Sequence, residues 1–219
     1  MVFQTQDEKG IYVSLSEKVY QYLRDRIAEG FYHTGDTLIE MQVASELGVS
    51  RTPVREALKK LELEDLVASH PNRGVIVKGF TEQDYDDAFA IRCILEGQAA
   101  YWAAERISAS QLQELANIVD LMEFYTVRKD AARLAHLDNQ FHEIVYQASC
   151  SRTILHVMPS LHHSILSARQ ASLTDPGRAE ESLSEHREIL DALSRHDANL
   201  AKARMEEHVE TAGTHTHRH

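Results

Sequence analysis

"GVSRTPVREALKKLELEDLVASHPNRGVIV", residues 48–77, decides the fold of the first third of this 219-residue chain. Gly48 ends one helical pattern, and Ser50 is a favourable N-cap for the next helix. Apolar residues then recur at helical spacing as far as Leu61. Beyond them, apolar and polar residues alternate on both sides of residues 71–74, which predicts a two-stranded hairpin.

The residues before this stretch supply two more helices. A helical pattern runs from residue 14 to Gly30, and a short helix covers roughly residues 40–47. Helix, short helix, tight turn, third helix and hairpin is the order of a winged helix-turn-helix, whose third helix enters the major groove of DNA. We therefore predict such a DNA-binding domain over residues 14–80, preceded by a flexible arm at residues 1–13.

The third helix presents polar side chains at its N-terminal end, which is the end that meets bases and phosphates in such a domain. Arg51 and Arg55 share a face at four-residue spacing, and arginine binds guanine or phosphate bidentately. Taken alone, this pair is equally typical of a solvated helix, but the turn, the cap and the hairpin favour DNA binding. The predicted DNA-binding residues are Ser50, Arg51, Thr52, Arg55, Arg73 and Gly74.

From Thr81 onward the pattern is helical almost to the end of the chain. We predict a mostly α protein, whose second domain, residues 81–212, is an all-helical bundle of about six helices. A disordered polar tail is expected at residues 213–219. The expected helices cover residues 82–106, 109–127, 130–149, 151–173, 177–195 and 198–212.

The acidity of the chain is unevenly distributed. The formal net charge is −11, but residues 1–80 hold 10 basic and 12 acidic residues, whereas residues 81–219 hold 13 and 22. The charge that argues against a nucleic-acid partner therefore lies in the second part. Two cysteines imply no disulfide framework, and neither a signal peptide nor a membrane-spanning run is evident, so we expect a cytoplasmic protein.

"LDNQFHEIV", residues 137–145, places Asp138 and His142 on one helix face among apolar residues. His186 and His208 fall at core-facing positions of two later helices. One such histidine is usually a satisfied core residue, but three of them with an aspartate are costly to bury without a shared partner. A divalent transition metal would provide that partner, with zinc as the first choice and nickel, manganese or iron as alternatives.

The same argument suggests an anionic ligand. One carboxylate against a divalent cation leaves a positive local charge, and open coordination positions suit a small carboxylate effector. Arg92 and Glu96 lie one helical turn apart and Arg169 lies on a later helix. We predict these three as effector-binding residues, with the two arginines clamping the anion. A surface ion pair is the alternative explanation for the two arginines.

Residues 23–77, "LRDRIAEGFYHTGDTLIEMQVASELGVSRTPVREALKKLELEDLVASHPNRGVIV", resemble the DNA-binding domain of the GntR family of bacterial transcription regulators. The resemblance covers about residues 14–78. It implies that Arg51, Thr52 and Arg55 contact operator DNA, with Gly74 at the tip of the hairpin. Met41 departs from the pattern, because some relatives have a basic residue there.

The second part, about residues 82–212, is similar to the FCD effector-binding domain of FadR-type GntR regulators. The similar stretches are "AIRCILEGQAAYWAAER", "LDNQFHEIVYQAS", "SEHREILDAL" and "ARMEEHVE". The resemblance implies a helical bundle, a homodimer and an effector that is often a small organic acid. The metal-ligand pattern of the family maps onto Asp138, His142, His186 and His208.

These observations predict a transcription regulator, not an enzyme. Its dimer would bind double-stranded operator DNA, and a small carboxylate bound at the metal would control the operator affinity. Two alternatives stay open. One is a metal-dependent hydrolase, although Glu143, beside His142, points about 100° away around the helix. The other is a metal that only joins three helices.

Overall fold

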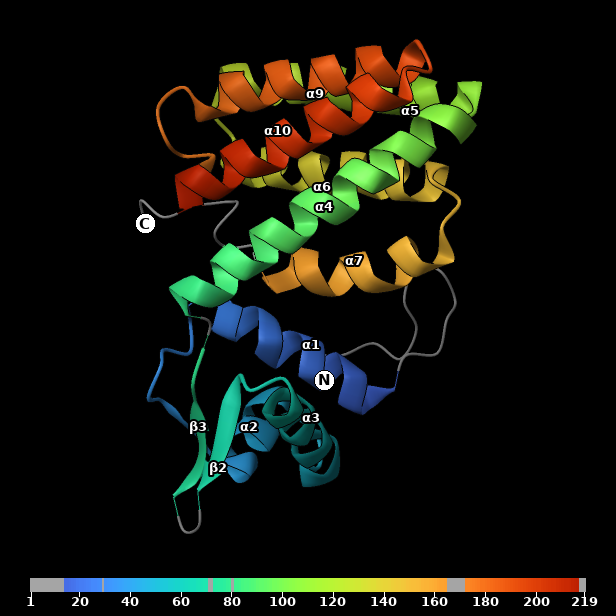
Figure 1. Cartoon of the computed structure of the whole chain (residues 1–219). Helices are drawn as coiled ribbons and strands as arrows, with labels where there is room; N and C mark the ends of the chain where they lie inside the picture. Colours follow the sequence, from blue (N-terminus) through green and yellow to red (C-terminus); the bar gives the residue numbers. More distant parts are fainter. Residues whose placement is uncertain (1–13, 29, 71–72, 80, 165–171, 217–219) are drawn as a thin grey trace. The chain divides into compact units, whose positions relative to one another are not determined.

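The computed structural model describes residues 14–28, 30–70, 73–79, 81–164 and 172–216. These residues are mostly helical with one small sheet (Figure 1), and they form two compact units, one ending at Thr81 and the other beginning at Glu82. The predicted fold class, a winged helix-turn-helix followed by a helical bundle, is confirmed. None of the described helices combines the length and the apolar character that a membrane-spanning segment requires.

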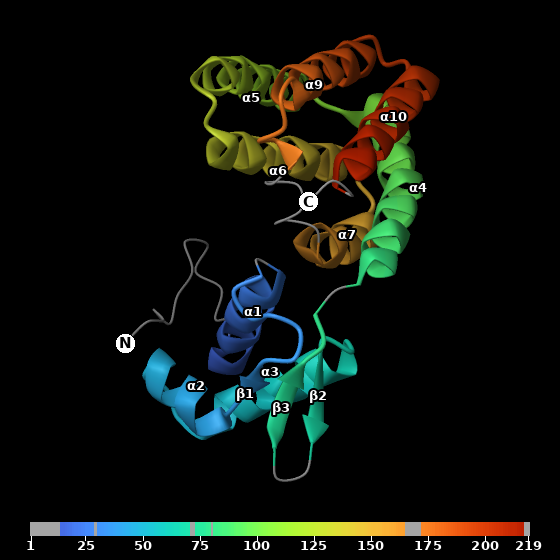
Figure 2. The ribbon, with the colours of Figure 1, turned by 90° about the vertical axis from the view of Figure 1, so that its left-hand side faces the viewer.

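The first unit is built on three helices and a sheet (Figure 2). Its core is a cluster of buried aliphatic residues, centred on Leu23 of the first helix and Val54 and Leu61 of the third. The first helix packs along the third. The elements are α1 (Leu15–Ala28), β1 (Thr37–Leu38), α2 (Glu40–Leu47), α3 (Arg51–Leu63), β2 (Val67–His70) and β3 (Gly74–Val77).

The turn between α2 and α3 lies where the sequence predicts it. Gly48 has the left-handed φ of 66°, and its N–H bonds to carbonyl oxygens at the end of α2. Ser50 occupies the N-cap position of α3, but its side chain makes no capping hydrogen bond. The serine hydroxyl therefore stands at the start of α3 without a role in holding the helix.

The sheet has three strands rather than the two of the predicted hairpin. Residues 37–38, for which the sequence analysis predicts no strand, form β1 and pair antiparallel with β3 in the order β1-β3-β2. Leu38 is 3% exposed, so its burial ties β1 to the core. Gly74 permits the close approach of β1 to β3, since a Cβ at this position would lie 3.2 Å from the Leu38 carbonyl oxygen.

The second unit contains six helices in its described part. Helix α10 lies along α4 over much of its length (Figure 1). Small residues allow this approach, because a Cβ at Gly97 would lie 2.5 Å from Cγ of Glu206. The helices are α4 (Glu82–Arg106), α5 (Ala109–Arg128), α6 (Ala131–Ala148), α7 (Arg152–Ser164), α9 (Arg178–Ser194) and α10 (Ala198–Thr216).

One prediction at the end of the last helix is wrong. Residues 213–216 are not a disordered tail, because α10 continues to Thr216. Gly213 packs against the Phe89 ring, and His215 forms an ion pair with Asp175, so tertiary contacts extend the helix. Of the predicted helix 151–173, the described part of α7 reaches Ser164 and Leu173 lies in a turn, while residues 165–171 lie outside the described residues.

Gly48→Ala is expected to destabilise the first unit by roughly 1–2 kcal/mol, because a Cβ is unfavourable in the left-handed conformation. Gly48→Asn should lose less, because asparagine tolerates this conformation better. Denaturant unfolding followed by circular dichroism measures both changes. Equal stability of Gly48→Ala and the parent chain would show that the turn does not require glycine.

Candidate metal centre and nucleic-acid interface

Four buried polar side chains meet inside the second unit. Helix α6 contributes Asp138 and His142, α9 contributes His186 and α10 contributes His208. Each of the four is at most 4% exposed. One ligand atom from each residue lies within 4.8 Å of the others. The four residues that the sequence predicts as metal ligands are therefore brought together.

The spacing of these atoms is close to that of a coordination sphere. Asp138 Oδ1 lies 3.3 Å from Nε2 of His186 and 3.8 Å from Nε2 of His208. It lies 3.9 Å from Nε2 of His142, whose Nε2 is 3.2 Å from that of His208. Bonds of about 2.0–2.2 Å to one ion would separate the ligand atoms by roughly 3–4 Å. The donor set therefore fits a divalent transition metal.

Each histidine places its other ring nitrogen against an acceptor. His142 Nδ1 lies 2.5 Å from Oε2 of Glu96, and His208 Nδ1 lies 2.6 Å from Oε2 of Glu185. His186 Nδ1 lies 2.7 Å from the carbonyl oxygen of Ser182. Because carboxylate and carbonyl oxygens only accept, each Nδ1 carries the proton and each Nε2 keeps its lone pair.

The three Nε2 atoms therefore face one another and the Asp138 carboxylate, and none of these nitrogens carries a proton that could form a hydrogen bond. Four lone-pair donors this close repel one another unless a cation lies between them. Burial, reinforced by the neighbouring His186 and His142, holds the pKa of His208 well below its ordinary value. His208 thus stays in the neutral form that a metal requires.

The two carboxylates that orient the rings are themselves held by arginines. Arg178 donates to both oxygens of Glu185, at 2.9 Å each, and Arg178 is only 2% exposed. Arg92 Nε donates to Oε1 of Glu96 at 2.6 Å, and both residues are fully buried. The alternative of a surface ion pair is therefore wrong for Arg92. Glu96, one of the predicted effector-binding residues, bridges Arg92 and His142.

Sequence reasoning missed three of these supporting residues, Ser182, Glu185 and Arg178. The Ser182 carbonyl was within reach of prediction, because position i−4 lies one turn before His186 on the same helix. The contact of Glu185 with His208 joins α9 to α10 and has no local signal in the sequence. Arg169, the third predicted effector residue, lies outside the described residues.

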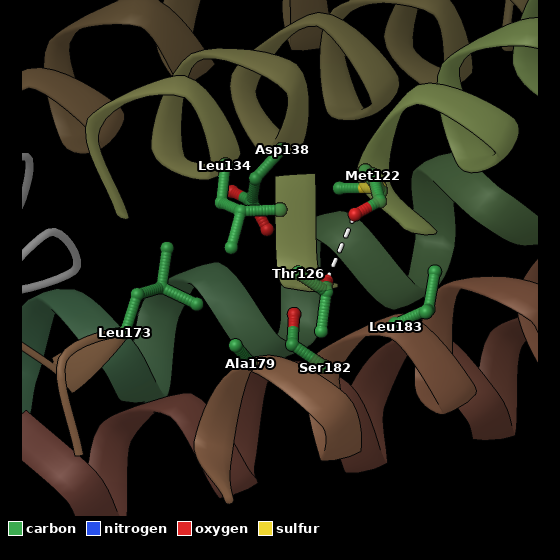
Figure 3. A pocket seen from close by; sticks show the side chains of 8 residues that line it. All are labelled: Met122, Thr126, Leu134, Asp138, Leu173, Ala179, Ser182 and Leu183. Atoms are coloured by element: carbon green, nitrogen blue, oxygen red, sulfur yellow. Dashed lines mark hydrogen bonds between the residues drawn. The ribbon is translucent and has the colours of Figure 1, made fainter. Parts of the chain in front are cut away.

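A narrow cavity of about 10 Å³ reaches Asp138, which is room for about one water molecule. Figure 3 shows Asp138 and Ser182 on opposite sides of it, with Leu173 and Leu183 at its two flanks. A larger cavity of about 380 Å³ shares four of its lining residues and carries the exposed Lys129 and Glu180 at its rim. The two cavities indicate a route from solvent toward Asp138. The shared residues are Thr126, Leu134, Leu173 and Ala179.

The first unit displays the six predicted DNA-binding residues on its surface. Ser50, Arg51, Thr52 and Arg55 are exposed at the start of α3, and Arg73 and Gly74 are exposed where β3 begins. The arginine side chains of α3 are about half exposed or more, at 61% for Arg51 and 51% for Arg55. These side chains can therefore reach a partner outside the unit.

A residue that the sequence reasoning missed contacts both of these arginines. Glu40, the first residue of α2, accepts hydrogen bonds from Arg55 Nε and Nη2 at 2.9 Å each. It accepts a third from Arg51 Nη2 at 3.0 Å. These hydrogen bonds lower the pKa of Glu40 to about 2, and the contribution of Arg55 is the largest. Partial burial of the carboxylate acts in the opposite direction.

Two family models match the chain. The model of bacterial regulatory proteins of the gntR family matches residues 15–77, and the FCD domain model matches residues 87–211. The probable D-xylose utilization operon transcriptional repressor of Paenarthrobacter nicotinovorans is 28% identical, over 90% of this chain and 86% of that protein. The HTH-type transcriptional repressor RspR of Escherichia coli (strain K12) is 26% identical over the same shares.

A solved structure of E. coli McbR/YncC shares the fold. It aligns with a TM-score of 0.78 and 22% sequence identity, over 94% of this chain and 98% of that chain. The two family models together match most of the chain, and the matched relatives are transcription regulators. The chain belongs to the GntR family of bacterial transcription regulators and carries the FCD domain.

Proposed function

We propose that this DNA-binding regulator responds to a small organic acid that binds at a divalent metal in its second unit. One observation carries this proposal: three Nε2 lone pairs and the Asp138 carboxylate converge, while every Nδ1 lies within 2.7 Å of an acceptor oxygen. Hydrogen bonds alone do not satisfy such a set, whereas one cation does. Zinc is the first choice, and nickel, manganese and iron also suit nitrogen-rich ligation.

Asp138, His142, His186 and His208 would hold the metal, which would supply a Lewis-acidic centre for an anion. The surrounding charges favour an anion as well. Glu96 and Glu185 are each balanced by an arginine, so the aspartate and the divalent ion leave a net positive charge. A small carboxylate is the natural ligand for such a centre.

Arg92 is the residue that we assign to the carboxylate. Its two terminal nitrogens are buried and make no hydrogen bond to the described part of the chain. Its Nε is occupied by Glu96, which also contacts His142, so the two terminal nitrogens keep donors to spare next to the residues that orient the site. Two such donors match a carboxylate bidentately. Arg169 stays a sequence prediction for the same role.

A hydrolytic function has less support. The carboxylates next to the metal ligands, Glu96 and Glu185, each bind a histidine Nδ1 and an arginine. Neither is therefore available as a general base for a bound water. The matched relatives are regulators, which agrees with a sensory centre.

On the DNA side, we propose that Ser50, Arg51, Thr52 and Arg55 contact the operator from α3, with Arg73 and Gly74 at the tip of the wing, the β2–β3 hairpin. A homodimer would place two α3 helices in successive major grooves of a pseudo-palindromic operator. Effector binding would change operator affinity if the acid binds the DNA-competent and the DNA-incompetent arrangements with different affinities.

Protein purified without chelator is expected to contain about one transition-metal ion per chain. His186→Ala and His208→Ala should lose the metal, and chelation should lower the melting temperature of the parent chain. His136→Ala is the matched control, since His136 is exposed on α6, away from the cluster. Elemental analysis that finds no metal after metal-replete growth would refute the proposed centre.

Arg92→Lys is expected to retain the metal but to lose the thermal stabilisation that small carboxylates give the metal-loaded protein. A lysine keeps the charge but has no fork to bind both oxygens. Arg133→Lys, an exposed change on α6, serves as the control. A thermal-shift screen of acetate, lactate, citrate and gluconate provides the measurement. Undiminished stabilisation of Arg92→Lys would assign the carboxylate to other residues.

Arg55→Ala is expected to weaken operator binding by about 5- to 150-fold, because a bidentate base contact is worth roughly 1–3 kcal/mol. The fold should be intact, since Arg55 is half exposed on the surface of α3. Gel-shift titration and circular dichroism test the two parts of this prediction. An unchanged shift by Arg55→Ala would remove α3 as the recognition helix.

A further inference from the structure

We propose that Glu40 is a positioning residue that raises the selectivity of this protein for its operator. It would do so by orienting Arg51 and Arg55 and by offsetting part of their charge. The inference rests on the proposed contact of these two arginines with operator DNA. It concerns a carboxylate that no sequence pattern singled out.

The contact joins the two helices of the helix-turn-helix. Glu40 begins α2, and the arginines lie in the first two turns of α3, 11 and 15 residues later. The Glu40 side chain is 25% exposed, half or less than half as exposed as either arginine. The carboxylate thus lies behind the guanidinium groups, which are left at the surface.

The geometry of Arg55 leaves its base-reading edge available. Its bidentate bond to Glu40 uses Nε and one hydrogen of Nη2. Of the five N–H donors of a guanidinium group, both hydrogens of Nη1 and the second of Nη2 stay available. That end-on edge matches O6 and N7 of guanine. Glu40 therefore restricts the rotation of Arg55 without occupying the edge that would read a base.

The charge of Glu40 affects the binding of DNA of any sequence, which also determines selectivity. Two arginines with one carboxylate present a net charge of +1 to DNA at the start of α3, instead of +2. Attraction to phosphate is independent of sequence and scales with the number of charges that the protein brings. A carboxylate behind the arginines therefore weakens binding to any duplex, while the oriented donors keep the contact with the correct bases.

The test compares full-length Glu40→Gln with Glu46→Gln. Glu46 is an exposed residue of the same helix, so both variants lose one negative charge from α2. The probes are an operator duplex, selected from random sequences by the parent chain, and a scrambled duplex of equal length. Binding to both is titrated over a range of salt concentrations.

Glu40→Gln is expected to bind the scrambled duplex about tenfold more tightly, and its operator-to-scrambled affinity ratio should fall by a similar factor. The salt dependence of scrambled binding should steepen by about one released counterion. Glu46→Gln should keep the ratio within twofold. An unchanged ratio in Glu40→Gln, or an equal change in both variants, would overturn the inference.

Glu40→Asp separates orientation from charge, because it keeps the negative charge on a shorter side chain. It is expected to bind the scrambled duplex as the parent chain does, but the operator more weakly. Parental operator binding by this variant would contradict the orienting role. Arg55→Ala tests the proposed DNA contact separately from the role of Glu40. If this variant binds both duplexes as the parent chain does, the proposed DNA contact is wrong, and the role of Glu40 is wrong with it.

Discussion

Three imidazole rings in the second unit turn their unprotonated nitrogens toward one carboxylate, and the bundle is arranged around that constraint. Each ring is fixed from behind by an acceptor: Glu96, Glu185 or the Ser182 carbonyl. Arginines on α4 and α9 then hold the two carboxylates. Four helices therefore meet through a chain of polar contacts: the arginines hold the carboxylates, and the carboxylates orient the imidazole rings.

The two units use arginine–carboxylate pairs in different ways. Arg178 and Arg92 are buried, so the loss of their partners would leave a charge without water or counterion. Arg51 and Arg55 are exposed, so water screens their bonds to Glu40, and their remaining donors can reach a phosphate or a base. The buried pairs suit a fixed internal site, and the exposed pairs suit a surface that binds an outside partner.

Much of the fold was accessible from the sequence, because helical periodicity and turn residues are local features. The four residues of the Asp/His cluster were accessible for the same reason, since each lies on the apolar face of its own helix. Strand β1 escaped prediction because two residues are too few for an alternating pattern. The last turn of α10 escaped because Gly213 looks like a helix end until Phe89 packs against it.

The sequence alone determined which segments are helical, which helix faces are apolar and which polar side chains interrupt those faces. These properties follow from spacing along a single element. Only the tertiary structure decided which nitrogen of His142 and of His208 faces the cluster and which carboxylate fixes it. It also decided that Glu40 stands behind the arginines of α3. The physical reason is that such contacts join residues on different helices, as His142 meets His208 66 positions away.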